Sequence, residues 1–403
     1  MVRVSAQKLN WRQWSEFAPT WERIHNLCPG ASFFLSRAWV DCWLATFGSE
    51  LNPDLLRFVK DGDVVGCCLL VWRTQWIRGV PLRRVYLNCA GENEADSTCI
   101  EYNSLLSLPD WTEEVAGALG AFLRNSRWDE LVLQGVEGDS PFCTVAQSLG
   151  SNEISVRPSH YVDLSPIRGS AGGFDSVLSS NSRQQIRRTQ RLYEADNGAC
   201  TLTVARTAEE AGEIFTRLAG LHQTAWQDRG RPGVFSSSRF TSFHRRLIQA
   251  GFAQDRIMLL EARAGTQVMG ALYSFLHGGK LYFYQSGFQY SADSRLKPGL
   301  LTHYLAIRHC LEQTTLREYD FLAGDSQYKR SLATANRPLS WIVVRRRTVP
   351  TLLFCALRWV KRKYVQIIKK SRRKDQPDGR VERSADISVP NIETGSVVGK
   401  HGE

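Results

Sequence analysis

The chain has 403 residues, 43% of them hydrophobic and 23% charged, a composition typical of a globular protein with room for two domains. Its ten cysteines include no Cys-x-x-Cys pair and no Cys/His cluster with zinc spacing, so we predict reduced thiols and no metal site. The net charge is +11, but residues 358–374 hold nine Lys or Arg and no acid; subtracting nine leaves about +2 elsewhere, so no specific nucleic acid is expected as a partner.

The first half of the chain is predicted to form one α/β unit. Helices are expected over 9–28, where Pro19 disturbs the apolar periodicity, and from Ser36 to Gly48, which supply an N-cap and a stop. The other predicted elements are a hairpin over 55–59 and 64–72, strands over 82–87, 130–134 and 160–164, and a helix over 110–125. The polar loop 88–103 has the composition of a groove lining but suggests no role.

A basic helix is predicted over 179–191, between the two halves. Arg183, Arg187 and Arg191 are four residues apart and therefore lie on one face. Such a row is commonly a solvated helix face. It also suits a clamp for phosphates or a sugar nucleotide, because each guanidinium pairs with two oxygens at once.

The second half repeats the order of elements of the first. Gly265–Gly270 resembles Gly62–Gly66, since each is a tight turn before a hydrophobic strand, and 320–326 resembles 133–140. This repeat predicts a tandem duplication. The predicted elements are a helix end at 218–230, helices over 240–250 and 299–311, and strands over 256–263, 268–277, 281–285, 316–322 and 337–345.

A last helix is predicted over 349–374, where apolar residues alternate with the basic ones. Its apolar run is too short and too interrupted to span a membrane. The composition fits either a packed C-terminal helix or an interfacial helix on an anionic membrane. Residues 375–403 are polar and aperiodic, which predicts a disordered tail.

The stretch 319–333 is the most informative part of the chain. A strand turns at Ala323-Gly324-Asp325 and then presents Tyr328, Lys329 and Arg330 together. An ordinary strand with a solvated basic turn has this composition, and so does a site that holds an anionic or nucleophilic substrate.

This stretch resembles the signature of the CelD/BcsL family, GNAT-type acetyltransferases associated with bacterial cellulose and exopolysaccharide synthesis. The matching residues are Tyr319, Asp320, Phe321, Gly324, Asp325, Tyr328 and Lys329. The Phe33-Phe34-Leu35-Ser36 opening with its Trp-rich helix, and the Arg-rich helix 179–191, are also typical of the family. The fold is similar to that of FemX-like aminoacyl transferases, which are built from two GNAT units.

The resemblance implies an α/β (α+β) fold of two tandem GNAT-like units with mixed, largely antiparallel sheets flanked by helices. The expected boundaries are 1–165 for the N-terminal unit, 166–348 for the C-terminal acetyltransferase unit, 349–374 for the basic amphipathic helix and 375–403 for the disordered tail. We expect the first unit to be a structural partner that walls the substrate groove.

The resemblance also implies acetyl-CoA as acyl donor. In GNAT enzymes the strand corresponding to 281–285 splays from its neighbour and the thioester lies in the gap, while a Gly-rich loop at the next helix grips the pyrophosphate. Here that loop has one glycine and a proline, which lacks an N–H. The predicted donor-binding residues are Arg295, Lys297, Gly299 and Leu300.

Roles at the acceptor side follow from the same resemblance. The predicted catalytic residues are Asp320 and Asp325, which position or deprotonate the acceptor, Tyr328, which protonates the leaving thiolate or orders substrate, and Lys329, which stabilises negative charge or binds phosphate. The predicted acceptor-binding residues are Arg183, Arg187, His222 and Trp226.

The predicted function is acyl-CoA-dependent N- or O-acetyl transfer to a cell-envelope or exopolysaccharide precursor, with a saccharide, sugar nucleotide or amine as acceptor. Two alternatives stay open: FemX-like aminoacyl-tRNA-dependent transfer to a peptidoglycan precursor, and a non-catalytic scaffold of a polysaccharide synthesis complex. Because no apolar signal segment follows Met1, we expect a cytoplasmic protein, with contact to the inner face of the plasma membrane through 349–374 as one interpretation.

Overall fold

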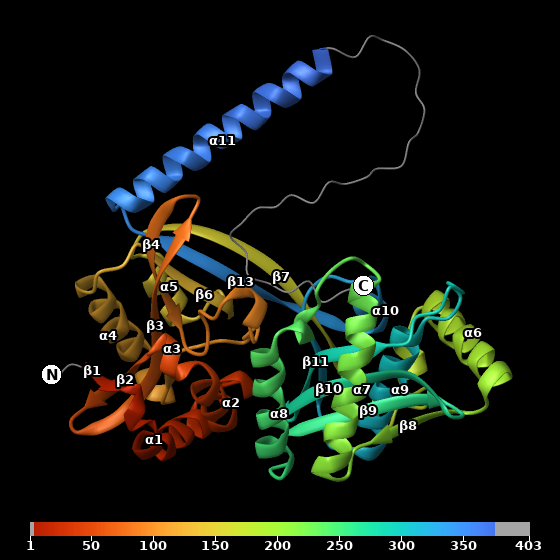
Figure 1. Ribbon diagram of the computed structural model, residues 1–403. Coiled ribbons are helices and arrows are strands. Elements are labelled where there is room, and N and C mark those ends of the chain that lie inside the picture. The colour runs from red at the N-terminus through yellow and green to blue at the C-terminus, as the bar shows by residue number, and fades with distance from the viewer. Residues whose placement is uncertain (1–3, 375–403) are drawn as a thin grey trace.

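The computed structural model describes residues 4–374, and their strands join in one 13-stranded sheet (Figure 1). The strands are β1 Ser5–Asn10, β2 Asp54–Lys60, β3 Asp63–Ile77, β4 Val80–Leu87, β5 Leu106–Ser107, β6 Glu130–Val136, β7 Ser151–Asp163, β8 Cys200–Val204, β9 Ile257–Ala264, β10 Gln267–His277, β11 Lys280–Phe288, β12 Glu318–Ala323 and β13 Ala335–Arg345. The α-helices are α1 Trp14–Leu27, α2 Arg37–Trp43, α3 Ser49–Leu51, α4 Thr112–Asn125, α5 Pro141–Gln147, α6 Ser180–Asn197, α7 Ala208–Gln227, α8 Ser238–Phe252, α9 Pro298–Gln313, α10 Gln327–Leu332 and α11 Val349–Lys374.

The strand order is β1-β2-β3-β4-β6-β13-β7-β12-β11-β10-β9-β8, with β5 paired to β3. Most neighbours are antiparallel, whereas β4 with β6 and β11 with β12 are parallel. Each parallel pair occupies the same place in its half, with α4 or α9 lying between its two strands in the chain. The predicted tandem arrangement of two mixed, largely antiparallel units is therefore confirmed.

The last strand of each half pairs with the other half. β7 ends the first half in sequence but lies between β13 and β12 in the sheet. β13 ends the second half in sequence but lies between β6 and β7. Figure 1 shows both strands running between the two lobes. This exchange fuses the two expected sheets into one, because the strand that would have been each unit's edge is paired.

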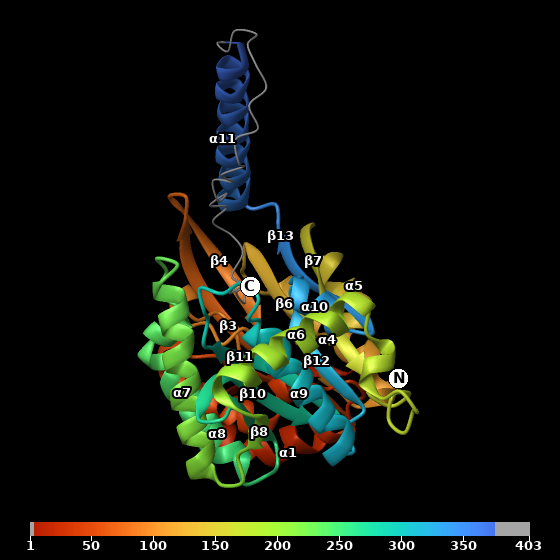
Figure 2. The same ribbon diagram turned by 90° about the vertical axis from the view of Figure 1, so that its right-hand side faces the viewer.

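Helices cover both faces of the sheet (Figure 2). On one face, α1 and α2 of the first half share a hydrophobic cluster with α7 and α8 of the second. On the other face, α4 and α5 cover the first half, and α6 and α9 cover the second. The shared cluster is aromatic; Trp39 of α2, for example, meets Phe243 of α8 with 4.9 Å between ring centroids. Apolar burial therefore joins the halves in addition to strand pairing.

Three local predictions are corrected. Residues 9 and 10 belong to β1, because Asn10 forms a capping box with Gln13 and α1 begins only at Trp14. Gly48 does not end a helix; the helical path runs on to Leu51 and ends at Asn52, which is left-handed with φ 43°. The strand expected at 160–164 begins already at Ser151, and its early residues are largely exposed, so no apolar alternation marks them.

The final helix, α11, projects from the body (Figures 1 and 2). Near its start, Phe354 packs on Val80 and Leu82 of β4, and Arg358 pairs with Glu153 of β7 at 2.6 Å. Within residues 4–374, no helix has the combined length and apolar character that a membrane span requires. The tail expected to be disordered, 375–403, lies outside the described residues.

Candidate active site

The strands β11 and β12 diverge after a short parallel pairing. They pair over three residue pairs, of which Tyr282 with Asp320 is the last. Beyond this point β11 continues to Phe288 along β10, while β12 follows β7. A gap therefore opens between β11 and β12 at the place where the sequence resemblance predicts a splay; we call it the second splay.

The end of β12 is a strained bulge. Asp320 pairs with Tyr161 but Ala323 pairs with Ser159, so β12 has one residue more than β7 between these pairs. Leu322 within the bulge is left-handed, with φ 58°. A buried leucine in this conformation costs about 1–2 kcal/mol, which surrounding contacts must offset.

Three buried charged side chains hold this bulge. Asp320 Oδ1 accepts the N–H of Leu322 at 2.7 Å, and Glu101 Oε2 accepts the N–H of Ala323 at 2.7 Å. Lys329 Nζ donates to the carbonyl oxygens of the same two residues, at 3.1 and 3.0 Å. The backbone groups of Leu322 and Ala323 are thereby satisfied without water.

Asp320 is enclosed by donors. Besides the Leu322 N–H, it accepts hydrogen bonds from the hydroxyls of Tyr102 and Ser159, and Arg337 lies 3.5 Å from it. Burial raises the pKa of Asp320. With its oxygens occupied in this way, Asp320 is suited to positioning rather than to accepting a proton.

Burial also shifts the pKa of the other two groups. It raises the pKa of Glu101 to about 7, opposed mainly by the Ala323 N–H, and lowers the pKa of Lys329 to about 8, opposed mainly by Glu101. Lys329 is 1% exposed. Its ammonium is directed at two backbone carbonyls, a position that suits fixing β12 better than binding a phosphate.

The helix α10 carries the other two predicted catalytic residues. The Tyr328 ring stacks on His303 of α9 with 5.0 Å between centroids, and burial raises the pKa of its hydroxyl, which keeps its proton at neutral pH. Asp325 is half-exposed; His160 Nε2 lies 3.1 Å from it and Arg330 Nη1 2.5 Å. Of the two carboxylates predicted to be catalytic, Asp320 and Asp325, Asp325 is therefore the accessible one.

His303 lies at the base of the second splay. Its ring contacts Phe283 of β11 and Phe321 of β12, with 4.4 and 5.3 Å between centroids. Its Nδ1 lies 2.8 Å from the Tyr319 hydroxyl, and its Nε2 has no hydrogen-bond partner among the described residues. Burial lowers the pKa of His303 to about 3, so the ring is neutral.

The predicted donor-binding residues surround the start of α9. Pro298 is its first residue, so the missing N–H costs nothing, and the N–H groups of Gly299 and Leu300 have no partner within the helix. Arg295 is paired with Asp293 at 2.6 Å, whereas Lys297 Nζ donates to neutral Gln185 of α6 at 2.7 Å. Among the described residues Lys297 has no acidic partner, so its charge beside the first-turn N–H groups makes the start of α9 suitable for an anionic group.

The predicted acceptor residues fall into two groups. Arg183 and Arg187 of α6 both engage the preceding turn: Arg183 Nη1 donates to the carbonyl oxygens of Asp175 and Leu178 at 3.1 and 2.6 Å, and Arg187 Nη2 lies 3.5 Å from the Asp175 carboxylate. Because Gln185 of α6 reaches Lys297, this group lies beside the donor-binding residues.

The second group lies across the sheet. His222 and Trp226 of α7 stack with 5.6 Å between centroids, and burial lowers the pKa of His222 to about 4. The helix α7 packs closely on β11, since a Cβ on Gly287 would lie 2.2 Å from the Leu218 carbonyl oxygen. The structure therefore does not gather the four predicted acceptor residues on one face.

Sequence reasoning missed the residues that come from other elements. They are Glu101, Tyr102, Ser159, His303 and Arg337. None belongs to a local motif around 319–333, and Glu101 and Tyr102 lie in the loop 88–103, whose polar composition was the one available signal.

The first half has an equivalent gap between β4 and β6, which we call the first splay. Its strands pair from Arg84 with Glu130 to Tyr86 with Val132. Asn103 then spans the gap, since its N–H donates to the Gly135 carbonyl of β6 at 3.1 Å and its Nδ2 donates to the Leu87 carbonyl of β4 at 3.0 Å. The chain itself thus occupies the first splay.

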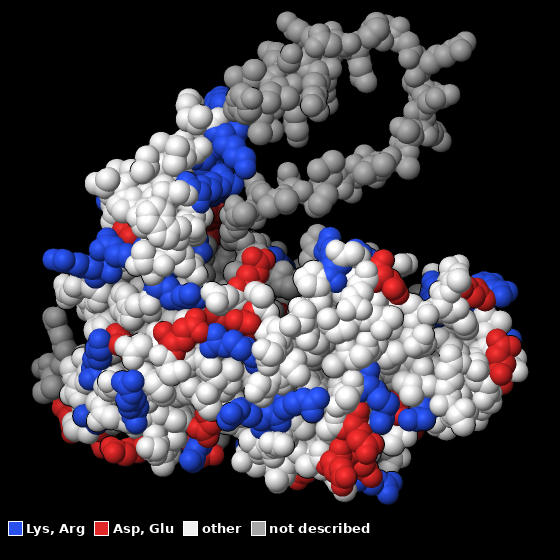
Figure 3. All heavy atoms as spheres, in the orientation of Figure 1, with Lys and Arg blue, Asp and Glu red and all other residues white. Residues whose placement is uncertain are grey.

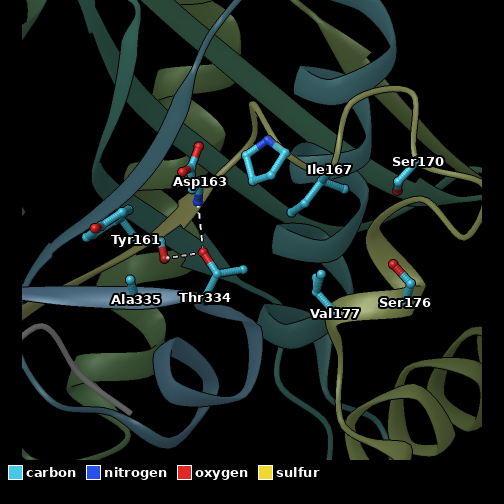
Figure 4. Close-up of a pocket in the computed structure, with 9 residues that line it drawn as sticks. Tyr161, Asp163, Ile167, Ser170, Ser176, Val177, Thr334 and Ala335 are labelled. Carbon is cyan, nitrogen blue, oxygen red and sulfur yellow. Dashed lines mark hydrogen bonds between the residues drawn. The ribbon is translucent and has the colours of Figure 1, made fainter.

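A pocket of about 350 Å³ lies elsewhere, between the end of β7, the start of β13 and the turn before α6 (Figure 4). In it, the Asp163 N–H donates to Thr334 Oγ1 at 2.9 Å, and this hydroxyl lies 3.5 Å from the Tyr161 carbonyl oxygen. None of the residues predicted from the sequence lines it. The Arg337 guanidinium covers the Tyr161 ring at 4.0 Å and lies 3.5 Å from Asp320.

Comparisons with known proteins agree with this geometry. The family model described as "Acetyltransferase (GNAT) domain" matches residues 180–330, which contain both strands of the second splay. No curated protein matches the sequence.

Among solved structures, FemX is similar with a TM-score of 0.51 and 10% identity, covering 81% of this chain and 95% of that chain. A tandem GNAT protein from the clavulanic acid biosynthesis pathway has a TM-score of 0.44 and 12% identity, covering 84% and 98%. L-PGS from Bacillus licheniformis has a TM-score of 0.47 and 10% identity, covering 79% and 95%. The chain is an acyltransferase with a GNAT acetyltransferase domain over residues 180–330, and its repeated strand arrangement, together with the likeness to the FemX fold, gives it a tandem GNAT-like architecture.

Proposed function

We propose that this acyltransferase moves an acetyl group from acetyl-CoA to an amine or hydroxyl of a cell-envelope or exopolysaccharide precursor, as the resemblance to the CelD/BcsL family implies. The acceptor class is a saccharide, sugar nucleotide or amine. The observation that carries the proposal is the second splay, where β11 and β12 part beyond Tyr282 and Asp320 next to the first turn of α9. Acetyl-CoA supplies the activated thioester.

On the donor side, Lys297 and the first-turn N–H groups of Gly299 and Leu300 bind phosphate oxygens. Arg295 contributes less, because Asp293 already neutralises it. Tyr328 holds a proton on its hydroxyl for the departing thiolate, a role supported by its raised pKa and its place beside the splay.

On the acceptor side, Asp325 orients or deprotonates the nucleophile, since it is accessible and lies against His160. Asp320 and Lys329 keep the end of β12 in shape. Arg187, which is exposed, helps to hold an anionic acceptor, and Arg183 fixes the start of α6. His222 and Trp226 border the acceptor from the opposite face of the sheet.

The proposed location is the cytoplasm, with α11 resting on the inner face of the plasma membrane. Leu352, Leu353, Leu357 and Val360 of this helix are exposed. In the part of α11 that Figure 3 colours, next to the body, Lys and Arg side chains lie on one side and uncharged residues on the other. An apolar side flanked by basic residues suits an anionic lipid surface, where each cation adds about 1 kcal/mol.

Calorimetric titration of the full chain with acetyl-CoA and CoA tests the donor. We expect saturable binding that Lys297→Ala weakens about tenfold, the size of one charge-assisted hydrogen bond, and Arg295→Ala weakens less. Tyr328→Phe should keep donor affinity and slow acetyl transfer to an identified acceptor about 100-fold or more. No binding of either ligand would refute the proposal and favour the aminoacyl-tRNA-dependent transferase or the scaffold.

Co-sedimentation with vesicles tests the membrane contact. Binding to vesicles containing phosphatidylserine, and not to pure phosphatidylcholine, is expected, and Leu352→Ser with Leu357→Ser should abolish it. Leu27→Ser is the matched control, because Leu27 is equally exposed on the body of the protein. Binding unaltered by the α11 substitutions would contradict the proposal.

A further inference from the structure

The segment Thr98–Tyr102 of the first half reaches both walls of the second splay; we call it the brace. The Tyr284 hydroxyl of β11 donates to the Thr98 carbonyl oxygen at 2.8 Å. On the other wall, Glu101 accepts the Ala323 N–H, and Tyr102 donates to Asp320. One short stretch of chain therefore fixes two strands that have stopped pairing with each other.

The brace is firmly seated at its Thr98 end. The Thr98 hydroxyl donates to Glu92 Oε1 at 2.7 Å, and the Trp43 indole N–H donates to the same oxygen at 2.8 Å. These residues are buried, so the contacts are not exchanged for water. On the other wall, Tyr284 also lies 3.1 Å from His244 Nε2, inside the aromatic cluster that the two halves share.

The backbone of the brace is strained as well. Cys99 and Tyr102 are both left-handed, each with φ 48°. A Cβ on Gly135 would lie 2.8 Å from the Glu101 Cα, so the brace packs directly on the backbone of β6. Strain of this kind, about 1–3 kcal/mol for each residue, persists where the surroundings determine the conformation and it clusters at functional sites.

Glu101 and Lys329 hold the same residue from opposite ends. The carboxylate binds the N–H of Ala323 and the ammonium binds its carbonyl oxygen. The orientation of this residue, next to the left-handed Leu322, therefore depends on a side chain supplied by the other half.

We infer that the brace sets the opening of the second splay, and that Glu101 is a positioning residue for the acyl-transfer site. This inference rests on the proposed function for its catalytic meaning. It makes the first half a part of the site, because Thr98 supplies one contact to the β11 wall and Glu101 one contact to the β12 wall.

The test uses the full chain in hydrogen-exchange mass spectrometry and acetyl-CoA calorimetry. Glu101→Ala should raise amide exchange in 321–324 about tenfold or more and weaken acetyl-CoA binding about tenfold, since a buried charged hydrogen bond is lost. Glu101→Gln retains an acceptor oxygen for the Ala323 N–H, and should restore most of the protection and affinity. Tyr284→Phe should raise exchange in 284–288 instead.

Asn103→Ala, immediately after the brace, is the matched control, because Asn103 spans the first splay. It should raise exchange near Leu87 and Gly135 and leave acetyl-CoA affinity unchanged. Equal loss of affinity in this variant would show a general loosening and overturn the assignment to Glu101.

Exchange in 321–324 that stays at the wild-type level in Glu101→Ala would overturn the brace. Raised exchange with unchanged acetyl-CoA affinity would overturn the positioning role and leave a structural contact. If Glu101→Ala does not fold, Glu101→Gln and Tyr284→Phe decide by the same readouts. Failure of the wild-type chain to bind acetyl-CoA refutes the proposed function separately, while the exchange data still decide whether the brace holds the strands.

Discussion

The two splays have the same strand arrangement, but they differ in what lies beyond the point where the strands part. In each, parallel strands part after three residue pairs, and the strand that follows contains one left-handed residue: Gly135 with φ 60° in the first and Leu322 with φ 58° in the second. In the first splay β4 stops at Leu87 and Asn103 fills the space beyond. In the second, β11 continues to Phe288.

The connection between strand and helix accounts for the difference. Residues 88–111 link β4 to α4 in the first half, whereas the shorter 289–297 links β11 to α9 in the second. The longer connection closes its own gap with Asn103 and reaches the other gap with Glu101. A single loop of the first unit thus fills one gap and supports the proposed site at the other.

The left-handed residues sharpen the contrast. Glycine takes this conformation without strain, so the first splay stores none at Gly135. The second splay places a leucine there and surrounds it with Asp320, Glu101 and Lys329. Strain kept at one of two equivalent points agrees with the proposed site at the second splay.

The most damaging change to the second splay should be Lys329→Met. It leaves the carbonyl oxygens of Leu322 and Ala323 buried without a donor and removes a positive charge that favours ionised Glu101, so the unfolding free energy should fall by about 3–5 kcal/mol in urea titrations. Lys280→Met, at a partly exposed pair with Glu318, is the control and should cost about 1 kcal/mol or less. A Lys329→Met protein as stable as wild type would contradict the account of β12.

Gly135→Ala should be the counterpart in the first splay. The new Cβ would lie 2.8 Å from the Glu101 Cα, and the alanine would have to adopt φ 60°. We therefore expect the unfolding free energy, measured by urea titration, to fall by about 2–4 kcal/mol. Gly117→Ala in α4 has open space and an ordinary φ, and should be neutral or stabilise by up to about 1 kcal/mol. Equal effects of the two substitutions would remove the steric argument.

The pH dependence of the unfolding free energy should also distinguish the second splay from the first. Burial raises the pKa of Glu101 to about 7, above its unfolded value. Its contribution is therefore fully present below the unfolded pKa and is lost as pH rises through about 7.

Between pH 5 and 8, wild type should accordingly lose about 1–2 kcal/mol relative to Glu101→Gln in urea titrations. Lys329, whose pKa burial lowers to about 8, acts in the opposite direction, losing its contribution as pH falls through that value. Exposed Glu113→Gln is the control and should track wild type. Parallel curves for wild type and Glu101→Gln would refute the assignment.

The smallest effect is expected outside both splays. Glu153 ties Arg358 of α11 to β7, and hydrogen bonds from Arg358 and then Arg345 lower its pKa to about 2. Because the pair is partly exposed, Glu153→Gln should cost less than about 1 kcal/mol and raise amide exchange over 349–358. The stabilisation from the Glu153–Arg358 ion pair should be lost as pH falls from the pKa of Glu153 in the unfolded chain through its folded value of about 2. Altered acetyl-CoA affinity in this variant would show that α11 is coupled to the second splay.

The site was only partly predictable. The turn 323–325 and the residues of α10 stand out locally, and the start of α9 was expected within one residue. Glu101, Tyr102 and Ser159 did not stand out, because their partners on β12 are 222, 218 and 161 residues away along the chain, respectively. No local sequence pattern indicates pairing over such separations. Lys329 looked like a surface cation, since basic neighbours hide that it is buried.

Periodicity, turns and the internal repeat were enough to determine two α/β units and most of their strands, because these depend on residues close in sequence. The tertiary structure alone decided that β7 and β13 change places between units, that Asn103 fills one gap, and that Glu101 completes the other. Those outcomes depend on which buried backbone groups lack partners once the strands part, and that is settled only when distant segments meet.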